Sequence, residues 1–392
     1  MKFDIWKECP KVPLPNILLT VVDNRGKTVP TAPSGHKLIA TNCIRNENLY
    51  PIYEKIRYLS EETYRTWFRA HPEPGDIIFV CKGTPGRVCL VPNPIDFCIA
   101  QDMVALRANP QIVYNKYLLA VLRSFQIQEQ ILSTSVGDVI PHFKKSFFDQ
   151  IMIPIPNMDI QKSIGDFYYT ISEKIELNKK INDNLSDLLQ TIYQGQFGKV
   201  GLASNCGILA DICSYSKDKI EISKLSLDTY YSTENMLPEK SGAVKATSLP
   251  TTSQTTACHK GDTLISNIRP YFKKIVYCED DCGCSTDVLC FKPVHPRYTA
   301  YLFSTLYADS FFDFMVAGAK GTKMPRGDKQ QIMTYPVVLP LEKDLNEFNF
   351  VATPILTQIY SNRTESERLS AIRDTLLPKL ISGEIDVSGI QL

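Results

Sequence analysis

The chain has 392 residues, of which 44% are apolar and 22% are charged. This length and composition predict two or three folded domains and exclude a largely disordered chain. Lys and Arg number 43 against 42 Asp and Glu, so a formal charge of +1 excludes a protein that binds nucleic acid by bulk charge alone.

The N-terminus lacks the apolar core of a signal peptide, and the chain has no apolar run of about 18 residues. We therefore expect no membrane span and a cytoplasmic protein, in which the twelve cysteines stay reduced. The spacing that comes closest to a zinc site is that of Cys278, Cys282 and Cys284, with His259 and His295 nearby. Because the paired CxxC pattern of a structural zinc site is absent, we expect buried thiols and no metal.

The first predicted elements in chain order are two strands within residues 75–92, GDIIFVCKGTPGRVCLVP. Residues 261–278, GDTLISNIRPYFKKIVYC, repeat this pattern at an offset of 186 residues. Each segment opens with Gly-Asp, enters an apolar run, passes a Pro with basic residues, and returns to a second apolar run. This pattern predicts a β-hairpin with a polar turn in each segment.

Two further pairs of segments repeat in the same order. Residues 150–156, QIMIPIP, match residues 331–340, QIMTYPVVLP, and both predict an extended stretch interrupted by Pro. A predicted helix over residues 160–193 matches one over about 345–377. Three pairs with offsets of 181 to 186 residues indicate a tandem duplication: globular unit, helix, globular unit, helix.

Both predicted helices carry a heptad seam, in which the spacing alternates between four and three residues. Polar residues lie in the middle of both seams, where facing polar side chains fix the register at some cost in stability. We expect the two helices to pair as a coiled coil; the alternative is that each packs only on its own globular unit. A helix of about 32 residues spans about 48 Å, and Pro378 followed by Gly383 is expected to end the second helix. The seam residues are Ile171, Ile175, Asn178, Asn182, Leu185, Leu189 and Ile192 in the first helix, and Ile355, Ile359, Asn362, Ser366, Leu369, Arg373 and Leu376 in the second.

The positive charge is concentrated outside the helices, because each helix carries six acidic and four basic residues while the rest of the chain carries a net +5. Arg and Lys read guanine edges, and Asn reads adenine edges. Basic residues and one Asn cluster at equivalent places in both units, in the hairpin turns and in the loops at 134–145 and 318–326. Taken singly, each is best explained as a solvated surface charge, but as a repeated set they favour contact with DNA. The candidates are Lys82, Arg87, Lys144, Lys145, Asn267, Arg269, Lys273, Lys274, Lys320, Lys323 and Arg326.

Sequence motifs of catalysis are missing. Asn93-Pro94-Ile95-Asp96 does not match the Asn-Pro-Pro-Tyr loop of a methyltransferase, and neither a Walker loop nor a GxSxG motif is present. No spacing supports a pair of nucleophile and base. The sequence therefore favours recognition over catalysis, with no catalytic residue assigned.

These segments resemble the specificity (S) subunit of Type I restriction–modification systems, and the resemblance covers essentially the whole chain. Residues 261–293 are similar to a target recognition domain of that family, and residues 75–107 are similar to a second, divergent one. Residues 153–184, with EKIELNKKIND, resemble its central helix. Residues 376–387, LLPKLISGEIDV, resemble its C-terminus.

The resemblance implies an α+β fold with two target recognition domains, each a twisted sheet with short helices, separated by two long antiparallel coiled-coil helices in a pseudo-two-fold repeat. The expected domains are 1–157 and 197–341 for recognition, 158–196 for the central helix, and 342–392 for the distal helix and tail.

The function that the resemblance implies is non-catalytic recognition of double-stranded DNA at a bipartite, asymmetric target. The helices would set the spacing of the two half-sites and bind two methyltransferase (M) subunits, and restriction (R) subunits would join the complex. The chain itself would bind no cofactor, while S-adenosylmethionine, ATP and Mg²⁺ would be bound by the partner subunits. The alternative is an assembly or regulatory protein that keeps the recognition fold but no longer binds DNA.

Overall fold

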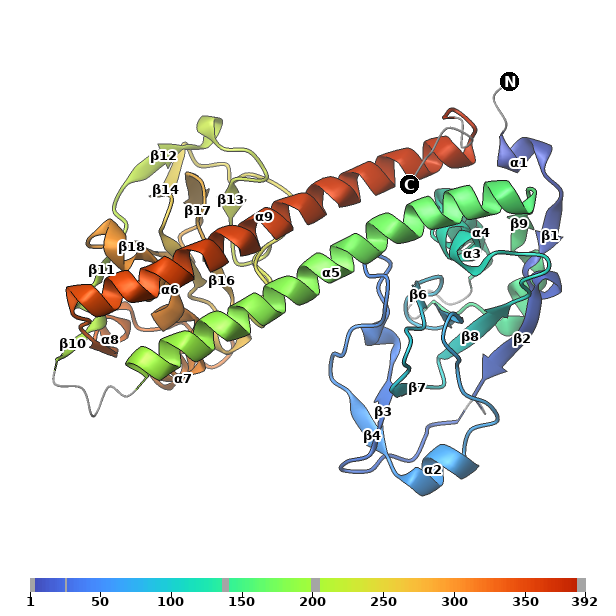
Figure 1. Cartoon of the computed structure of the whole chain (residues 1–392), viewed down its shortest axis with the longest axis horizontal. Helices are drawn as coiled ribbons and strands as arrows, with labels where there is room; N and C mark the ends of the chain where they lie inside the picture. Colours follow the sequence, from blue (N-terminus) through green and yellow to red (C-terminus); the bar gives the residue numbers. More distant parts are fainter. Residues whose placement is uncertain (1–3, 25–26, 136–140, 199–204, 386–392) are drawn as a thin grey trace. The chain divides into compact units, whose positions relative to one another are not determined.

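The computed structural model describes residues 4–24, 27–135, 141–198 and 205–385 (Figure 1). The chain divides into a first unit, Met1–Asn178 with Thr364–Leu392, and a second unit, Lys179–Arg363. Each unit contains one globular part and a portion of each of the two long helices. Among the helices that the structure describes, none combines the length and the apolar character that a membrane crossing requires.

The globular part of the first unit contains, in chain order, α1 (Ile5–Glu8), β1 (Lys11–Pro13), β2 (Leu18–Asp23), β3 (His36–Ile39), β4 (Arg57–Leu59), α2 (Glu61–Thr66), β5 (Ile77–Val80), β6 (Val88–Leu90), β7 (Phe97–Ile99), β8 (Met103–Ala108), α3 (Asn115–Leu122), α4 (Phe125–Thr134) and β9 (Met152–Pro154). Its central sheet is antiparallel, in the order β2-β8-β5-β6. Successive side chains of a strand face opposite sides of a sheet. In β5, Ile77 and Phe79 therefore pack with α3 and α4, whereas Ile78 and Val80 pack against a second sheet, β4-β3-β7.

The globular part of the second unit contains β10 (Cys206–Ile208), β11 (Cys213–Tyr215), β12 (Lys219–Glu221), β13 (Tyr230–Tyr231), β14 (Gln254–Cys258), β15 (Thr263–Ser266), β16 (Ile275–Tyr277), β17 (Cys282–Cys284), β18 (Val288–Pro293), α6 (Thr299–Tyr307), α7 (Asp309–Ala317), α8 (Lys329–Ile332) and β19 (Pro336–Val338). Its central sheet is also antiparallel, in the equivalent order β11-β18-β15-β16. In β15, Ile265 packs with α6 and α7, and Leu264 packs against a second sheet, β12-β14-β17-β13.

The predicted repeat is confirmed in the central sheets. The two predicted hairpins are β5–β6 and β15–β16. The two segments interrupted by Pro form β9 and β19, which pair antiparallel with β1 and β10. The second sheets differ, because β3 lies between β4 and β7 in the first unit, whereas β14 and β17 are the central strands in the second. The repeat therefore preserves the framework of each unit but not the outer sheet.

Two helices of 40 residues each, α5 (Met158–Phe197) and α9 (Glu342–Ile381), are longer than the predicted 32 residues. They pair antiparallel, because Asn178 contacts Glu365 in the first unit and Asn182 contacts Ile359 in the second. The predicted fold class, an α+β chain with two recognition-type units and two long antiparallel helices, is thereby confirmed.

The prediction that Pro378 ends the second helix is wrong, because α9 continues to Ile381. A Pro inside a helix lacks the N–H that would bond to the carbonyl four residues earlier. Leu377 and Ile381 are nevertheless buried in the core of the first unit, and this packing holds the last turn in place. Gly383 has a φ of +66° just beyond the helix, which is the conformation typical of a helix C-terminus.

Candidate nucleic-acid interface

The repeated Gly-Asp pair builds the start of each hairpin. Gly75 and Gly261 have φ angles of +89° and +92°, which glycine adopts without strain. The buried carboxylates of Asp76 and Asp262 each accept a backbone N–H three residues back, at 2.8 Å in both units. The Gly-Asp pair is thus part of the framework and not a binding motif.

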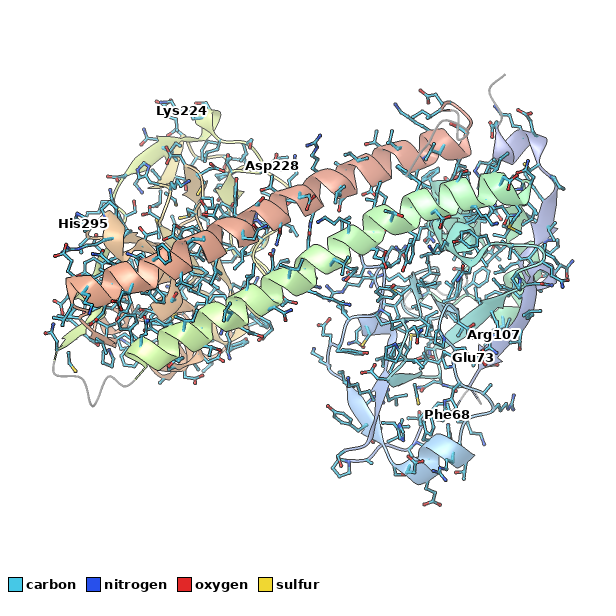
Figure 2. The ribbon with its side chains drawn as sticks, in the orientation of Figure 1. Phe68, Glu73, Arg107, Lys224, Asp228 and His295 are labelled. Carbon is cyan, nitrogen blue, oxygen red and sulfur yellow. The ribbon has the colours of Figure 1, made fainter. Side chains whose placement is uncertain are left out.

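The two aspartates differ in their charged partners. Arg107 donates to both oxygens of Asp76 at 3.0 Å. Arg107 also forms an ion pair at 2.8 Å with Glu73, which lies beside it (Figure 2). Asp262 has no arginine partner within the described residues and accepts instead from the Cys290 thiol at 3.4 Å. Burial raises the pKa of Asp262 as a result.

The tip of each hairpin is hydrogen-bonded to the loop that precedes the last strand of its unit. Gly83 N donates to Pro141 O at 2.9 Å in the first unit, and Arg269 N donates to Pro325 O at 2.8 Å in the second. Adjacent β-bridges join residue 82 to His142 and Ile268 to residue 326. In both units, therefore, the fold brings together the two loops in which the candidate DNA-contacting residues cluster.

In the first unit, Lys82, Lys144 and Lys145 are exposed and Arg87 is half-buried. Lys145 forms an ion pair with Asp23. Lys82, Arg87 and Lys144 have no ion-pair partner among the residues that the structure describes. The loop that contributes Lys144 includes residues 136–140, which lie outside the described residues.

In the second unit, the loop cations Lys320, Lys323 and Arg326 are exposed. Lys320 forms an ion pair with Asp328 at 2.6 Å, and Arg326 forms one with Asp287 at 3.3 Å. In the described part of the chain, Lys323 has no such partner. Its charge is therefore the most available one of the loop.

Two of the four candidates in the second hairpin, Lys273 and Lys274, are held by side-chain contacts within the domain. Asn267 is only 6% exposed, and Arg269 is half-buried in a left-handed conformation. Lys273 forms an ion pair with Asp309 at 2.8 Å. Lys274 donates to the Thr233 carbonyl at 2.5 Å, and burial lowers the pKa of its ammonium group. These contacts support the domain itself, so a role in DNA binding stays a prediction for these residues.

Three exposed apolar side chains beside these cations were not predicted from the sequence. Tyr271 and Phe272 lie at the tip of the hairpin in the short 3-10 helix η7 (Pro270–Phe272), and Met324 lies in the neighbouring loop. The two rings contact each other, with centroids 4.7 Å apart. An aromatic pair within a predicted polar turn was the signal that could have identified them.

The predicted seam residues of α5 and α9 are all buried or half-buried, and polar contacts join the two helices at three of them, Asn178, Asn182 and Asn362. Lys174 forms an ion pair with Glu365 at 3.3 Å, and Asn178 donates to the same carboxylate at 2.8 Å. In the second unit, Asn362 Nδ2 donates to Asn182 Oδ1 at 2.8 Å. The seam comprises Ile171, Ile175, Asn178, Asn182, Leu185, Leu189 and Ile192 on α5, and Ile355, Ile359, Asn362, Leu369 and Leu376 on α9.

The thiols considered for a metal site lie in an apolar cluster between the two sheets of the second unit. Cys278, Cys282 and Cys284 are buried there with Cys258 and Cys290. Cys282 Sγ donates to Cys278 Sγ at 3.6 Å. Neither of the two histidines joins the cluster: His259 pairs with Asp218 and Asp281, and the His295 ring caps a 3-10 turn. Within the described residues, no group of three or more His, Cys, Asp or Glu side chains is arranged to hold a metal ion.

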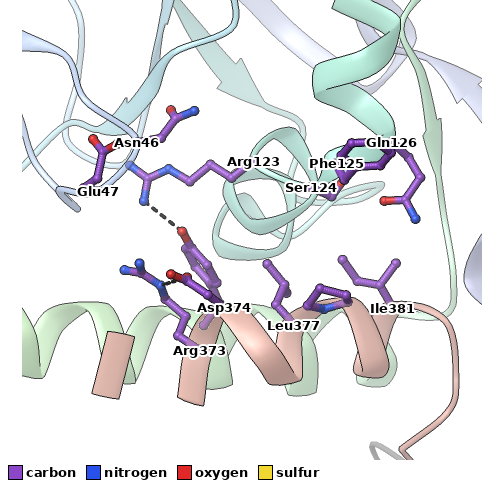
Figure 3. Close-up of a pocket in the computed structure, with 12 residues that line it drawn as sticks. Asn46, Glu47, Arg123, Ser124, Phe125, Gln126, Arg373, Asp374, Leu377 and Ile381 are labelled. Carbon is purple, nitrogen blue, oxygen red and sulfur yellow. Dashed lines mark hydrogen bonds and ion pairs between the residues drawn. The ribbon is translucent and has the colours of Figure 1, made fainter. Parts of the chain in front are cut away.

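A pocket of about 560 Å³ lies in the first unit, between the start of α4 and the end of α9 (Figure 3). Arg123 donates to the Tyr168 hydroxyl at 3.0 Å, and Arg373 Nε donates to Asp374 at 2.8 Å. With Glu47 also on the wall, the two cations face two carboxylates. This balance does not select an anion, and the pocket lining holds no pair of nucleophile and base.

Comparisons with known proteins find similarity to specificity subunits of Type I restriction enzymes. A family model described as the Type I restriction modification DNA specificity domain matches residues 31–187. The chain is 25% identical over 127 residues to the Type I restriction enzyme HindI specificity subunit of Haemophilus influenzae, covering 31% of this chain and 28% of that protein. It is 19% identical over 343 residues to the Type I restriction enzyme MjaIX specificity subunit of Methanocaldococcus jannaschii, covering 81% and 79%.

Solved structures give similar matches. The S subunit of a Type I restriction–modification system from M. genitalium aligns with a TM-score of 0.49 at 17% identity, over 97% of this chain and 98% of that one. The HsdS subunit from Thermoanaerobacter tengcongensis aligns with a TM-score of 0.37 at 15% identity, over the same shares of the two chains.

Proposed function

Because this chain is a relative of the specificity subunits of Type I restriction–modification systems, we propose that it selects the DNA sequence on which such a complex acts. Each globular part would read one half of a split target in double-stranded DNA. The chain would recognise the target sequence and would have no catalytic activity. S-adenosylmethionine, ATP and Mg²⁺ would bind to the partner subunits.

The observation that carries this proposal is the repeated construction of the hairpin and its loop. The backbone hydrogen bond from Gly83 to Pro141 has its counterpart from Arg269 to Pro325, so both units present the same pair of loops. The side chains on these loops differ between the units, however. A shared framework with unlike tips is what two unlike half-sites require, because base edges are distinguished by the side chains that contact them.

The long helices support a second part of the proposal, the binding of two methyltransferase subunits and, through the complex, of restriction subunits. Leu177, Ile181 and Leu188 on α5 are exposed although they are large and apolar. Their spacing of four and seven residues places them along one stripe outside the seam. Such a stripe suits a helix of a partner protein.

Mapping of methylated adenines in cells with and without the gene tests the proposed function and reveals the target. A split, asymmetric motif that disappears with the gene is the expected result. Gel-shift assays of the chain with its methyltransferase partner should then show retardation of that target. If no DNA sequence is retarded, the chain is an assembly or regulatory protein and the proposal fails.

Charge reversal tests where the DNA binds. Lys82→Glu in the first unit and Lys323→Glu in the second should each weaken binding on the order of tenfold at low salt and flatten the dependence of affinity on salt, because each removes a cation free to contact phosphate. Lys162→Glu, an exposed site on α5, is the matched control and should leave affinity unchanged. Equal effects of all three variants would mean that the hairpin loops do not face the DNA.

A further inference from the structure

The two hairpin tips share one backbone shape but are built from different residues. Gly83 and Gly86 have φ angles of +85° and +88° in the first unit. At the equivalent places in the second unit, Arg269 and Lys273 have φ angles of +50°. Glycine adopts this left-handed conformation without strain, whereas residues with a side chain are strained in it. The second unit thus keeps side chains where glycine would fold more easily.

The strain extends to the segment packed beside this tip. Glu239 and Lys240 have φ angles of +53° and +58°. Their backbone N–H groups donate to Phe272 O at 2.8 Å and Lys273 O at 3.0 Å. In the described part of the chain, four of the five non-glycine residues with a positive φ therefore lie around one hairpin tip. Backbone strain that the surrounding structure maintains is concentrated at functional sites.

Ion pairs hold the same tip in place. Lys240 and Lys273 both contact Asp309 Oδ1 at 2.8 Å, from two segments that are far apart in the sequence. Hydrogen bonds from both lysines lower the pKa of Asp309 to about 2, so its carboxylate stays charged at neutral pH. The tip is therefore fixed on three sides: by the 239–240 segment, by α7 and by the loop at Pro325.

The fixed hairpin tip exposes a pair of aromatic side chains to solvent. Between the two left-handed residues, the second tip has Pro-Tyr-Phe where the first has only Thr-Pro. Tyr271 is 47% exposed and Phe272 is 36% exposed. The neighbouring loop adds the exposed side chains of Met324 and of Lys323, a cation with no ion-pair partner in the described ranges of the chain. Apolar and aromatic side chains beside cations are the means by which proteins insert between base steps or stack on bases.

We propose that Tyr271 and Phe272 form a wedge that packs against base faces in the half-site bound by the second unit, and that the first unit has no such wedge. This inference rests on the proposed function. The two half-sites are then read differently: the second is unstacked at one base step, while the first keeps regular duplex geometry.

The experiment uses the full chain with its methyltransferase partner. It is bound to duplexes of the mapped target in which 2-aminopurine replaces each position in turn. The fluorescence of 2-aminopurine rises when the base is unstacked. We expect a several-fold rise at one step of the second half-site and none in the first. The double variant Tyr271→Ala, Phe272→Ala should abolish this rise. It should lower the affinity for the target about 10- to 100-fold, since stacking on one base contributes about this much.

Matched variants distinguish a wedge from a general loss of DNA affinity or of folding. Val294, just after β18, is 56% exposed, and Val294→Ala should change neither fluorescence nor affinity. Thr84→Ala at the first tip should also have no effect on fluorescence. Tyr271→Phe and Phe272→Tyr should retain the rise, and because these side chains are exposed, all variants should keep the unfolding temperature of the wild type.

Two outcomes would overturn the wedge alone. If Lys323→Glu weakens DNA binding while the alanine variants do not, the proposed function stands and the wedge is refuted. If the alanine variants lose the methyltransferase partner instead, the aromatic pair is a protein contact. If the wild-type complex binds no DNA, the proposed function itself fails.

Discussion

The pairing of α5 with α9 can be tested by a double-mutant cycle on Asn182 and Asn362. Asn362 Nδ2 donates to Asn182 Oδ1 at 2.8 Å, and Asn182 Nδ2 donates to the carbonyl of Ile359 at 3.1 Å. Gln358 completes the group by donating to Asn362 Oδ1 at 2.7 Å. The changes are Asn182→Leu, Asn362→Leu and the two together.

The expected energies follow from these contacts. Asn362→Leu leaves Asn182 Oδ1 without its donor, and a buried polar atom that loses its partner costs about 1–3 kcal/mol. Because Asn182 is only half-buried and Gln358 is exposed, water replaces part of what is lost. We expect each single variant to lose about 1 kcal/mol of unfolding free energy. The double variant replaces the pair by two apolar side chains in contact, so we expect it to be no less stable than the wild type. The coupling energy is then about 2 kcal/mol, within the range for residues in direct contact.

Guanidinium unfolding provides the assay, with two probes. Trp6 and Trp67 are the only tryptophans and both belong to the first unit, so their fluorescence follows that unit. Helical circular dichroism follows both units. The variants should shift the dichroism transition and leave the fluorescence transition in place. Strictly additive losses in the double variant would refute the contact, and a double variant more stable than the wild type would show that the Asn pair is kept at the expense of stability.

Three further predictions address packing, charge and spacing. A Cβ on Gly165 would lie 2.6 Å from the backbone of Tyr117, so Gly165→Ala should destabilise the first unit by more than about 2 kcal/mol. The control Gly195→Ala lies at an open position of the same helix and should stabilise the protein by about 0.5–1 kcal/mol. Equal effects of the two variants in thermal unfolding would refute the close packing of α5 on α3. Because the folded pKa of Asp309 is lowered to about 2, its contribution to stability is present above the unfolded value near 3.8 and is lost as the pH falls through 2. The difference in unfolding midpoint between wild type and Asp309→Asn should therefore shrink from pH 5 to pH 2, and a difference that does not change with pH would contradict the two ion pairs. Insertion of seven residues after Asn182 and seven after Asn362 lengthens both helices by about 10 Å and should widen the unread spacer by about three base pairs. An insertion in α5 alone should abolish function, because it leaves seven residues without a seam partner. A methylation motif that is unchanged by the paired insertion would refute the spacing role of the helices.

The framework could be predicted from the sequence because its determinants are local. The hairpins starting at Gly75 and Gly261 and the strands interrupted by Pro each depend on a short pattern that recurs in the other unit. The seam of α5 and α9 depends on the alternating spacing of four and three residues between apolar side chains. This spacing is visible in the sequence of any helix that buries one face. The same period placed polar residues in the middle of both seams, and the structure adds that Asn182 and Asn362 are the pair in contact.

What the sequence did not indicate depends on contacts between distant residues. The sequence predicts that the helix ends at Pro378. The helix continues because Leu377 and Ile381 are buried in the core of the first unit, which cannot be seen from the sequence. The sequence predicts a free cation at Lys274, but its ammonium group donates to the backbone carbonyl of Thr233, 41 residues earlier. Backbone angles at Arg269 could not be predicted either, because side-chain residues seldom adopt a left-handed conformation.

These buried and paired cations change which part of the second unit is available for recognition. Of its candidate residues, Lys273, Lys320 and Arg326 already have carboxylate partners, so each gains less from a phosphate than an unpaired cation does. In the proposed function, electrostatic attraction to the DNA backbone would therefore be modest, in keeping with the overall charge of +1. Selectivity then comes from contacts that depend on the bases, and the proposed wedge of Tyr271 and Phe272 would provide such a contact without adding charge. Such a recognition unit would bind random DNA weakly and would gain its affinity from the correct sequence and from the proposed partner subunits that would hold the duplex with it.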